Sequence, residues 1–492
     1  MSAVQPARSS RQGYGLVAAT SIMLMMAGIV GTDSWEGFIG YALMTTACVA
    51  PVLLWMLAGA PGLPVFPMMS SLYYFYYALP ILRSESGIGV YSPTEILDAS
   101  VTVTLFLGAA TLAWQAVIAL PAGGRTAAAG RDVVSPAQLN SIIFYGLGLG
   151  VFYFVGLLSG SLNFLGTLFG LLRAVLLAAT SVSCFLLGHA AARRYIRGGR
   201  LAAAVSLLTA IVVLSWSTLF LAEGTIYVLA AMFGYVVTSR RIPWTTFAIV
   251  GAIVTVLHAG KGEIRQRYWD ANTNTVGGMS VTHVPVIMAD WAITGFETIA
   301  SGNDYSVAID RASLLRLLMQ VERLAPDYVP YVDGETYSYL PYMLVPRFIQ
   351  EDKLFSQASM TLLNIRFGFQ TAQSASVTAI GWGLIAEAYA NYGNIAAVLV
   401  GMFIGFFTGL LTRWSDGAAI LSAPTLVTIA AMLILVNAEA DFSYLFTNLF
   451  QGCAAILIFL VGFNTVSRMR RSAIARRRAR PPLNIHAPPH AS

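Results

Sequence analysis

The chain is dominated by apolar stretches, each close to the roughly 20 residues that a helix needs to cross a bilayer. Hydrophobic residues make up 57% of it and charged residues 11%. A soluble protein of this size needs roughly twice that share of charge to cover its surface. We therefore predict an all-α polytopic membrane protein with about twelve transmembrane helices, because helices satisfy their own backbone in lipid. The predicted spans are 14–31, 37–58, 64–82, 99–120, 139–158, 167–189, 201–217, 219–238, 243–260, 394–412, 419–438 and 444–465.

One long gap interrupts the apolar series. It divides the chain into four predicted parts, which are an N-terminal bundle of about nine spans (1–260), a large helical segment (261–393), C-terminal spans (394–465) and a basic disordered tail (466–492). The gap holds nine of the 29 Lys and Arg residues, together with carboxylates and tyrosines. Such a mixture, placed outside the membrane, suits a charged, sugar-like or phosphate-bearing substrate.

The arginines between the spans predict the orientation. With the N-terminus inside, the segments that carry most of the loop arginines all fall on the cytoplasmic side. Twelve spans then place both termini in the cytoplasm and residues 261–393 outside. The basic tail, Arg468–Arg480, is expected to bind anionic lipid or a partner.

Residues 312–325 predict an amphipathic helix. Leu314, Leu318 and Val321 follow helical spacing, whereas Arg316 and Arg323 lie on the opposite stripe. A guanidinium group can donate two parallel hydrogen bonds to phosphate oxygens, so this stripe could bind a phosphate group. The alternative is that it simply faces solvent.

The gap contains three further sets of polar residues, and two of them have alternative interpretations. His283, Asp290 and Glu297 recur every seven residues and would share one helix face, facing either a cavity or water. Five tyrosines between 327 and 342 suit sugar contact or a membrane-surface belt. Asp333 and Glu335 are weak evidence for a metal, so none is predicted.

Two ionisable residues fall inside predicted spans. Arg173 and Glu223 lie near the outer ends of the sixth and eighth spans. An arginine at mid-membrane costs about 2.5–3.5 kcal/mol on insertion scales. We expect the two residues either to pair with each other or to line one outward-facing cavity. Glu439 and Asp441, at the outer turn of the last hairpin, are further candidates for an acid or base.

Two motifs of the gap resemble those of the bacterial oligosaccharide repeat-unit polymerases, the Wzy-type O-antigen and exopolysaccharide polymerases. That family often has a Pro-Arg pair followed by Trp-Pro and Lys-Pro. This chain keeps Pro346, Arg347 and Lys353 but has Gln350-Glu351 and Leu354 in place of the others. The second motif, Glu-x-Tyr-x-Asn-Phe-Gly, is present as Glu387–Gly393 with Tyr392 for Phe. Within it, Glu387 and Asn391 are one helical turn apart and would share a face, and Gly393 allows a break before the next span. The resemblance covers roughly residues 200–465.

The resemblance implies a glycosyltransferase of the integral-membrane GT-C kind in the bacterial inner membrane. Its substrates would be undecaprenyl-pyrophosphate-linked oligosaccharides, joined by inverting transfer without metal or cofactor. A chain-length regulator would be a partner, and nucleic acid would not. Cations would stabilise the departing pyrophosphate, and a carboxylate would accept the proton of the acceptor hydroxyl. The expected base is Glu387 or Asp352, and the expected substrate-binding residues are Arg347, Arg316, Arg323, Lys353, Arg366, Tyr389, Asn391, Arg173 and Glu223.

Two alternatives stay open. An O-antigen ligase would use the same donor with a different acceptor, and His258 and His283 are the outer histidines that it could use. A transporter or flippase of lipid-linked glycans would place charge along the bundle core. Arg173 and Glu223 are the main residues that fit this pattern.

Overall fold

The computed structural model describes residues 11–82, 87–120, 134, 136–270, 275–276, 281–301, 313–345, 349–350, 354, 357–375 and 380–478. These residues are almost entirely helical, with one short antiparallel hairpin of β1 (Trp269–Asp270) and β2 (Thr275–Val276). The prediction of an all-α chain is confirmed in this form.

Nine helices in the described part of the chain are long and apolar enough to cross a membrane, as a polytopic membrane protein requires. Each corresponds to a predicted span, including the tight pair predicted at 201–238. They are α2 (Trp35–Leu57), α5 (Pro93–Ala119), α6 (Pro136–Leu158), α7 (Phe169–Ala192), α8 (Gly198–Trp216), α9 (Leu221–Ser239), α10 (Trp244–Tyr268), α17 (Gly383–Ser415) and α19 (Phe442–Arg478).

The other three predicted spans are shorter or broken helices. The apolar part of α1 (Arg11–Gly31) is Ala19–Gly31, and α18 is Ala423–Leu435. The segment predicted at 64–82 consists of α3 (Val65–Tyr73), a π-helical turn η1 (Tyr74–Ala78) and α4 (Leu79–Leu82). π-helical turns widen a helix locally and are frequent at functional sites.

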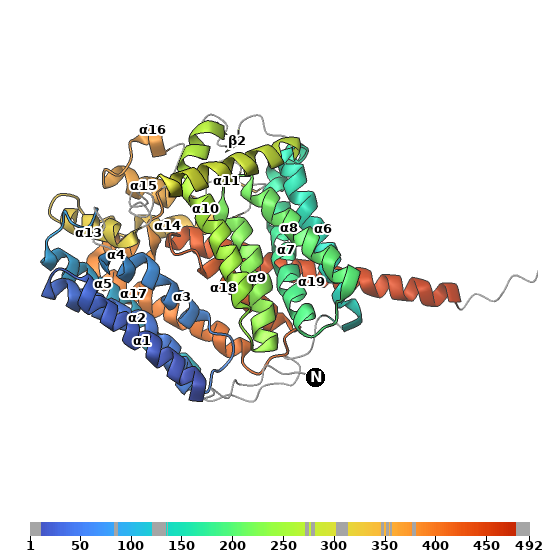
Figure 1. Ribbon diagram of the computed structural model, residues 1–492, viewed down its shortest axis with the longest axis horizontal. Coiled ribbons are helices and arrows are strands. Elements are labelled where there is room, and N and C mark those ends of the chain that lie inside the picture. The colour runs from blue at the N-terminus through green and yellow to red at the C-terminus, as the bar shows by residue number, and fades with distance from the viewer. Residues whose placement is uncertain are drawn as a thin grey trace, which may run out of the picture.

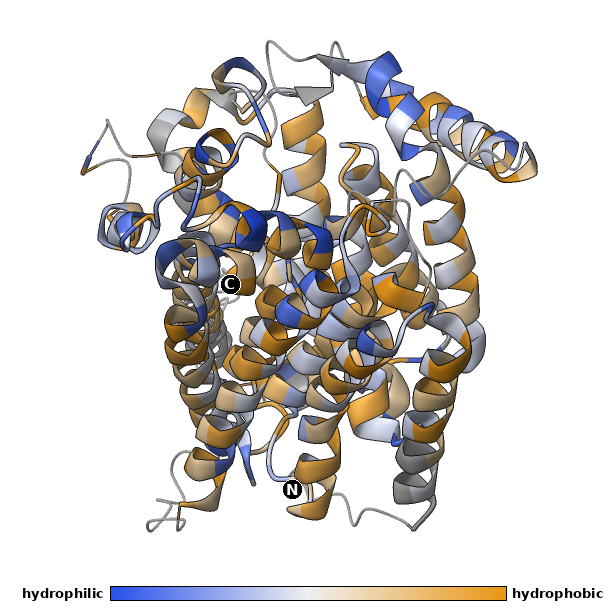
Figure 2. Cartoon of the chain, turned by 90° about the vertical axis from the view of Figure 1, so that its left-hand side faces the viewer, coloured by the Kyte–Doolittle hydropathy of each residue, from blue (hydrophilic) through white to orange (hydrophobic). Residues whose placement is uncertain are grey.

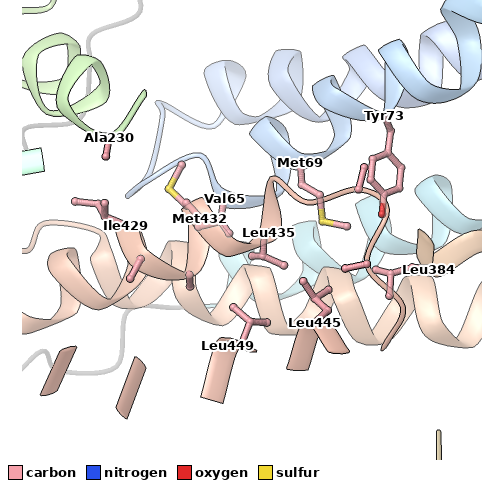
Figure 3. Packing of buried hydrophobic residues seen from close by; sticks show 14 of the residues in the cluster. Val65, Met69, Tyr73, Ala230, Leu384, Ile429, Met432, Leu435, Leu445 and Leu449 are labelled. Atoms are coloured by element: carbon pink, nitrogen blue, oxygen red, sulfur yellow. The ribbon is translucent and has the colours of Figure 1, made fainter. Parts of the chain in front are cut away.

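The helices form two groups with α18 between them (Figure 1). In one group α5 packs on α2 and α17, and in the other α7 packs on α6, α9 and α19. Figure 3 shows Met432 and Leu435 of α18 among side chains of α3 and α19, represented by Met69 and Leu445. The apolar core therefore continues through α18 from one group to the other.

Most polar elements gather at one end of the bundle, which we call the polar end (Figure 2). Between α10 and α17 the chain forms short helices in place of long apolar ones. These are η3 (Val281–His283), α11 (Val284–Ala300), α13 (Leu314–Leu324), α14 (Glu335–Leu344), α15 (Ala358–Arg366) and α16 (Ala372–Ala375). A further 3-10 turn, η2 (Asn163–Leu168), precedes α7.

Two helices differ from expectation near their ends. α17 begins before its predicted span and breaks where Gly393 has a positive φ of 62°, as expected for a glycine at the entry to the membrane helix. α19 continues as a helix to Arg478, although residues 466–478 were expected to be disordered. Ala and Arg are strong helix formers, so this segment extends the helix before it.

Candidate functional site

A cavity of about 600 Å³ lies between α7, α9, α18 and α19. Arg173 of α7 and Glu223 of α9 both line it, and the two side chains also interact electrostatically. They therefore share one cavity, and its outward orientation stays a prediction. The hydroxyls of Tyr153, Tyr227 and Tyr444 lie close enough to Arg173 to interact with it electrostatically. Of these, Tyr227 and Tyr444 line the cavity, so charge and hydroxyl groups are concentrated in one part of its wall.

The remaining wall is largely apolar. α18 contributes Ala430, Leu433 and Ile434, and α19 contributes a longer series that includes Leu445 and Ile456. The cavity can therefore accept a molecule with a charged portion and a hydrocarbon portion. Ligand pockets commonly combine a mostly apolar wall with a few polar groups in this way.

The segment between α10 and α17 reaches the cavity through α14. Met343 and Leu344, at the end of α14, line the cavity, and so does Leu354. The predicted residues Arg347, Asp352 and Lys353 lie outside the described residues. In sequence they connect Leu344 to Leu354, two residues of the cavity wall.

Glu387 is not on the cavity surface, because its side chain is fully buried at the start of α17. Its Oε2 accepts a hydrogen bond of 2.6 Å from the backbone N–H of Phe442, the first residue of α19. One turn later, Asn391 donates to the Glu387 carbonyl oxygen (2.8 Å) and to Thr336 Oγ1 (3.0 Å). The Gly334 N–H donates to Asn391 Oδ1 at 2.8 Å. The matched motif thus joins α17 to α14 and α19.

Asp441 is fully buried beside this network, as the residue that caps α19. Its Oδ1 accepts from the Tyr444 N–H at 2.7 Å, the usual geometry of an aspartate N-cap. Burial raises the pKa of the Asp441 carboxyl. Its neighbours in sequence, Ala440 and Tyr444, line the cavity, so the acid network lies directly behind the cavity wall.

Three buried polar atoms of this network have no hydrogen-bond partner among the described residues: Glu387 Oε1, Asp441 Oδ2 and Tyr337 Oη. The Tyr337 ring packs edge-on against Phe442, with centroids 5.3 Å apart. Since an unpaired buried oxygen costs about 1–3 kcal/mol, such atoms in a native protein require an explanation.

The predicted cations of α13 lie on a different surface, where α13 packs against α5, α17 and η1. The amphipathic prediction is confirmed, because Leu314, Leu318 and Val321 are buried and Arg316 and Arg323 are exposed.

The two arginines of α13 have different surroundings. The Arg323 guanidinium pairs with Glu95 (Nε–Oε1 2.6 Å, Nη2–Oε2 3.0 Å) and stacks on the Tyr91 ring at 4.2 Å. Arg316 lies over the backbone of Gly87. Arg323 therefore connects α13 to the start of α5.

Two other predicted residues hold loop 330–335 in place. Arg366 donates to the carbonyl oxygen of Tyr331 at 3.0 Å and lies 3.7 Å from Glu335. Tyr389 packs edge-on against Tyr331, with centroids 6.4 Å apart. Together with Asn391 they position the loop that leads into α14. This loop precedes α14, whereas the cavity-lining residues Met343 and Leu344 are at the end of that helix.

His283, Asp290 and Glu297 follow the water-facing interpretation. His283 and Glu297 are exposed, and Asp290 accepts hydrogen bonds from Arg267 (3.0 Å) and Tyr268 (3.0 Å) of α10.

The sequence analysis did not single out Glu322, which is half-buried where α13 packs against α5 and α17. Thr102 donates to Glu322 Oε1 at 2.6 Å, and burial raises the pKa of Glu322 to about 7. Its position was detectable, because it follows Leu318 by four residues and therefore falls on the apolar face of α13. Asp441 was similarly detectable as a helix cap, an aspartate immediately before an apolar run.

No protein-family model matches the chain, and no curated protein or solved structure matches it. The functional assignment therefore depends on the residues of the site.

Proposed function

We propose that the chain is a membrane glycosyltransferase that joins oligosaccharide repeat units carried on a polyprenyl pyrophosphate. The observation that carries this proposal is the cavity between α7, α9, α18 and α19. It offers a cation and a carboxylate in one part and hydrocarbon side chains in the rest, which matches a lipid-linked, pyrophosphate-bearing glycan. Of the two motifs that resemble those of the repeat-unit polymerases, 387–393 joins α17 to α14 and α19, and 346–353 lies in sequence between Leu344 and Leu354, two residues of the cavity wall.

In the proposed reaction an acceptor hydroxyl attacks the anomeric carbon of the growing glycan. The bond from that carbon to the pyrophosphate oxygen breaks, and the carrier pyrophosphate departs with the bonding electrons. Arg173 and Arg347 stabilise the departing charge, with Lys353 in support, as fixed cations do without a metal. Arg316, which was expected to share this role, lies on α13 away from the cavity, and we do not assign it there. No cofactor is required for this transfer.

The acceptor proton passes to a carboxylate. Among the described carboxylates Glu223 lines the cavity, and we assign it this role. Asp352, which lies between Leu344 and Leu354 in sequence, is the second choice. Glu387, the base expected from the sequence, is enclosed behind the wall, and we assign it the positioning of α14 and α19.

The proposal includes a place in the cell. The two shorter apolar helices and the broken segment α3–η1–α4 complete twelve crossings in a GT-C-like arrangement, with both termini in the cytoplasm of a bacterial inner membrane. The polar end then faces outward, where a chain-length regulator would act on the product.

The test uses cells that lack the gene, complemented with the wild-type protein, Arg173→Ala or Arg347→Ala. Carrier-linked and surface glycans are extracted and sized on a gel. Single repeat units in place of long polymer, in the deletion and in both variants at normal protein level, support the proposal. Full-length polymer that is not transferred to its final acceptor would identify a ligase.

A transporter of lipid-linked glycans is the second candidate, because Arg173 and Glu223 place charge inside the helix bundle. In that case the repeat units would be confined to the cytoplasmic leaflet, where a glycosidase added outside spheroplasts could not reach them, and the polymerase proposal would be wrong.

A further inference from the structure

α11 lies across α10 at the polar end, as Figure 1 shows. The two helices are in close contact. Trp291 Nε1 donates to the Leu257 carbonyl oxygen at 2.6 Å, and a Cβ added to Gly295 would meet the Val256 carbonyl oxygen at 2.1 Å. A Cβ added to Gly260 would meet the Gly295 nitrogen at 2.8 Å. α11 therefore crosses α10 at about residues 256–260.

This crossing lies at the boundary between the apolar and the charged parts of α10. Residues 244–260 contain no Asp, Glu, Lys or Arg, whereas 261–267 contain Lys261, Glu263, Arg265 and Arg267. A membrane helix passes from hydrocarbon to headgroups at such a transition. α11 is thus at the level of the membrane surface.

The polar seam of α11 shows which way the helix is turned. Asp290 accepts hydrogen bonds from Arg267 and Tyr268, which come last in α10 and lie farther toward the polar end than the crossing. His283 and Glu297 share the side of Asp290 by their seven-residue spacing, and both are exposed. The seam therefore faces away from the membrane, toward water.

The side of α11 opposite α10 is apolar and exposed. Val286, Ile293 and Phe296 have exposed fractions of 62%, 56% and 62%. Ala289 and Ala300 complete the same stripe and are exposed as well. Below the crossing, α10 itself has exposed apolar residues such as Ile249 and Ile253, so the stripe continues the lipid-facing surface of a membrane span.

We infer that α11 is an interfacial helix whose Val286–Ala300 stripe is inserted among the lipids of the leaflet at the polar end. Interfacial helices lie in the plane of the membrane, with a polar face to water and an apolar face in the acyl boundary. α11 has a polar face and an apolar face of this kind, and a third face packs against α10. It would anchor the start of the 261–393 segment at the membrane surface independently of the proposed enzymatic activity.

The experiment places spin labels on the full-length protein in vesicles of phosphatidylethanolamine and phosphatidylglycerol. Cys48 and Cys184 are fully buried, so Cys453→Ala provides a background for labelling. Labels are attached to Ile293→Cys and, as the matched control on the neighbouring polar seam, to Glu297→Cys. Collisions with oxygen, which enters lipid, are compared with collisions with a water-soluble nickel chelate.

Labels on the stripe should collide several-fold more with oxygen than with the chelate, and the label at 297 should show the reverse. Val286→Cys repeats the test at the other end of the stripe if the first variant does not fold. A stripe label that favours the chelate would overturn the inference. So would dipolar broadening between labels on different molecules, because it would show that a second copy covers the stripe.

Discussion

The helix pairs α5–α17 and α7–α9 use glycine in the same way but over different lengths. Along α17, Gly401, Gly405 and Gly409 all face α5, and a Cβ on Gly405 would meet the Ala110 carbonyl oxygen at 2.0 Å. In α7–α9, Gly188 and Gly234 give equally close contacts, 1.8 and 2.0 Å, to backbone oxygens of the partner helix. Small residues allow membrane helices to approach until their backbones touch.

The difference lies at the polar end of the second pair. There α7 and α9 carry Arg173 and Glu223 in place of close glycine contacts, and the cavity lies between these helices and α18 and α19. Between α5 and α17 the glycine contacts continue along the interface, which is closed and contributes to stability. Between α7 and α9 longer polar side chains replace glycine at the polar end, and space remains there for a ligand.

The strongest test of this comparison fills a contact in the closed pair. Gly405→Ala should reduce the yield and the unfolding temperature of the purified protein sharply, since overpacking costs about 1–3 kcal/mol or more. Gly108→Ala is the matched control, because Gly108 lies on α5 with no atom within 4 Å of an added Cβ. Thermal unfolding in detergent would measure both, and equal behaviour of the two variants would contradict the interpretation.

The second test changes the open pair. Arg173→Ala should lower glycan polymerisation by about a hundredfold, the usual effect of losing one group that stabilises a transition state. The unfolding temperature should change little, because the side chain lines a cavity. Arg173→Lys should restore part of the activity, and Arg197→Ala, at the N-cap of α8 in the connection that follows α7, should leave it intact. A large loss of stability in Arg173→Ala would show that Arg173 is structural.

The third test concerns the acid network behind the cavity wall. Glu387→Ala removes the acceptor of the Phe442 N–H, and leaving this donor unpaired should lower the free energy of unfolding by about 1–3 kcal/mol. Glu387→Gln keeps an acceptor oxygen in place and should be nearly neutral. Chemical denaturation would separate the two variants. If Glu387→Gln abolished polymerisation in a stable protein, Glu387 would be the base after all.

The last test concerns a pH dependence from Glu322. Burial raises its pKa from an ordinary value of 4.5 to about 7, so between these pH values the folded protein holds a proton that the unfolded chain releases. The stability should therefore decrease as the pH rises from about 4.5 to about 7. Glu322→Gln should flatten this part of the stability curve, and an unchanged slope would exclude Glu322 as its source.

Much of the local structure followed from short-range patterns. The helical spacing of the Leu and Arg residues predicted the buried and exposed faces of α13. Gly393 predicted the break in α17. Glu387 and Asn391 were predicted to share a face, and Asn391 does bond to the Glu387 carbonyl. In each case a helical period or a glycine acts within a few residues.

The partners across the fold could not be predicted in this way. Glu387 bonds to Phe442, which is 55 residues later, and Arg323 pairs with Glu95, which is 228 residues earlier. Such distances in sequence carry no periodic signal. For this reason Glu387 was expected to be an accessible base, whereas the fold encloses it.

The sequence by itself determined the membrane character of this protein, its apolar helices and the concentration of polar residues in one segment. These properties depend on composition and on the spacing of apolar residues within a few positions. Such local patterns have the same effect wherever the segment lies in the fold. Only the tertiary structure decided that Arg173 and Glu223 line one cavity, that Glu387 lies behind its wall and that α11 exposes an apolar stripe. Burial and contact depend on which helices pack together, and the chain settles that through contacts between residues far apart in sequence.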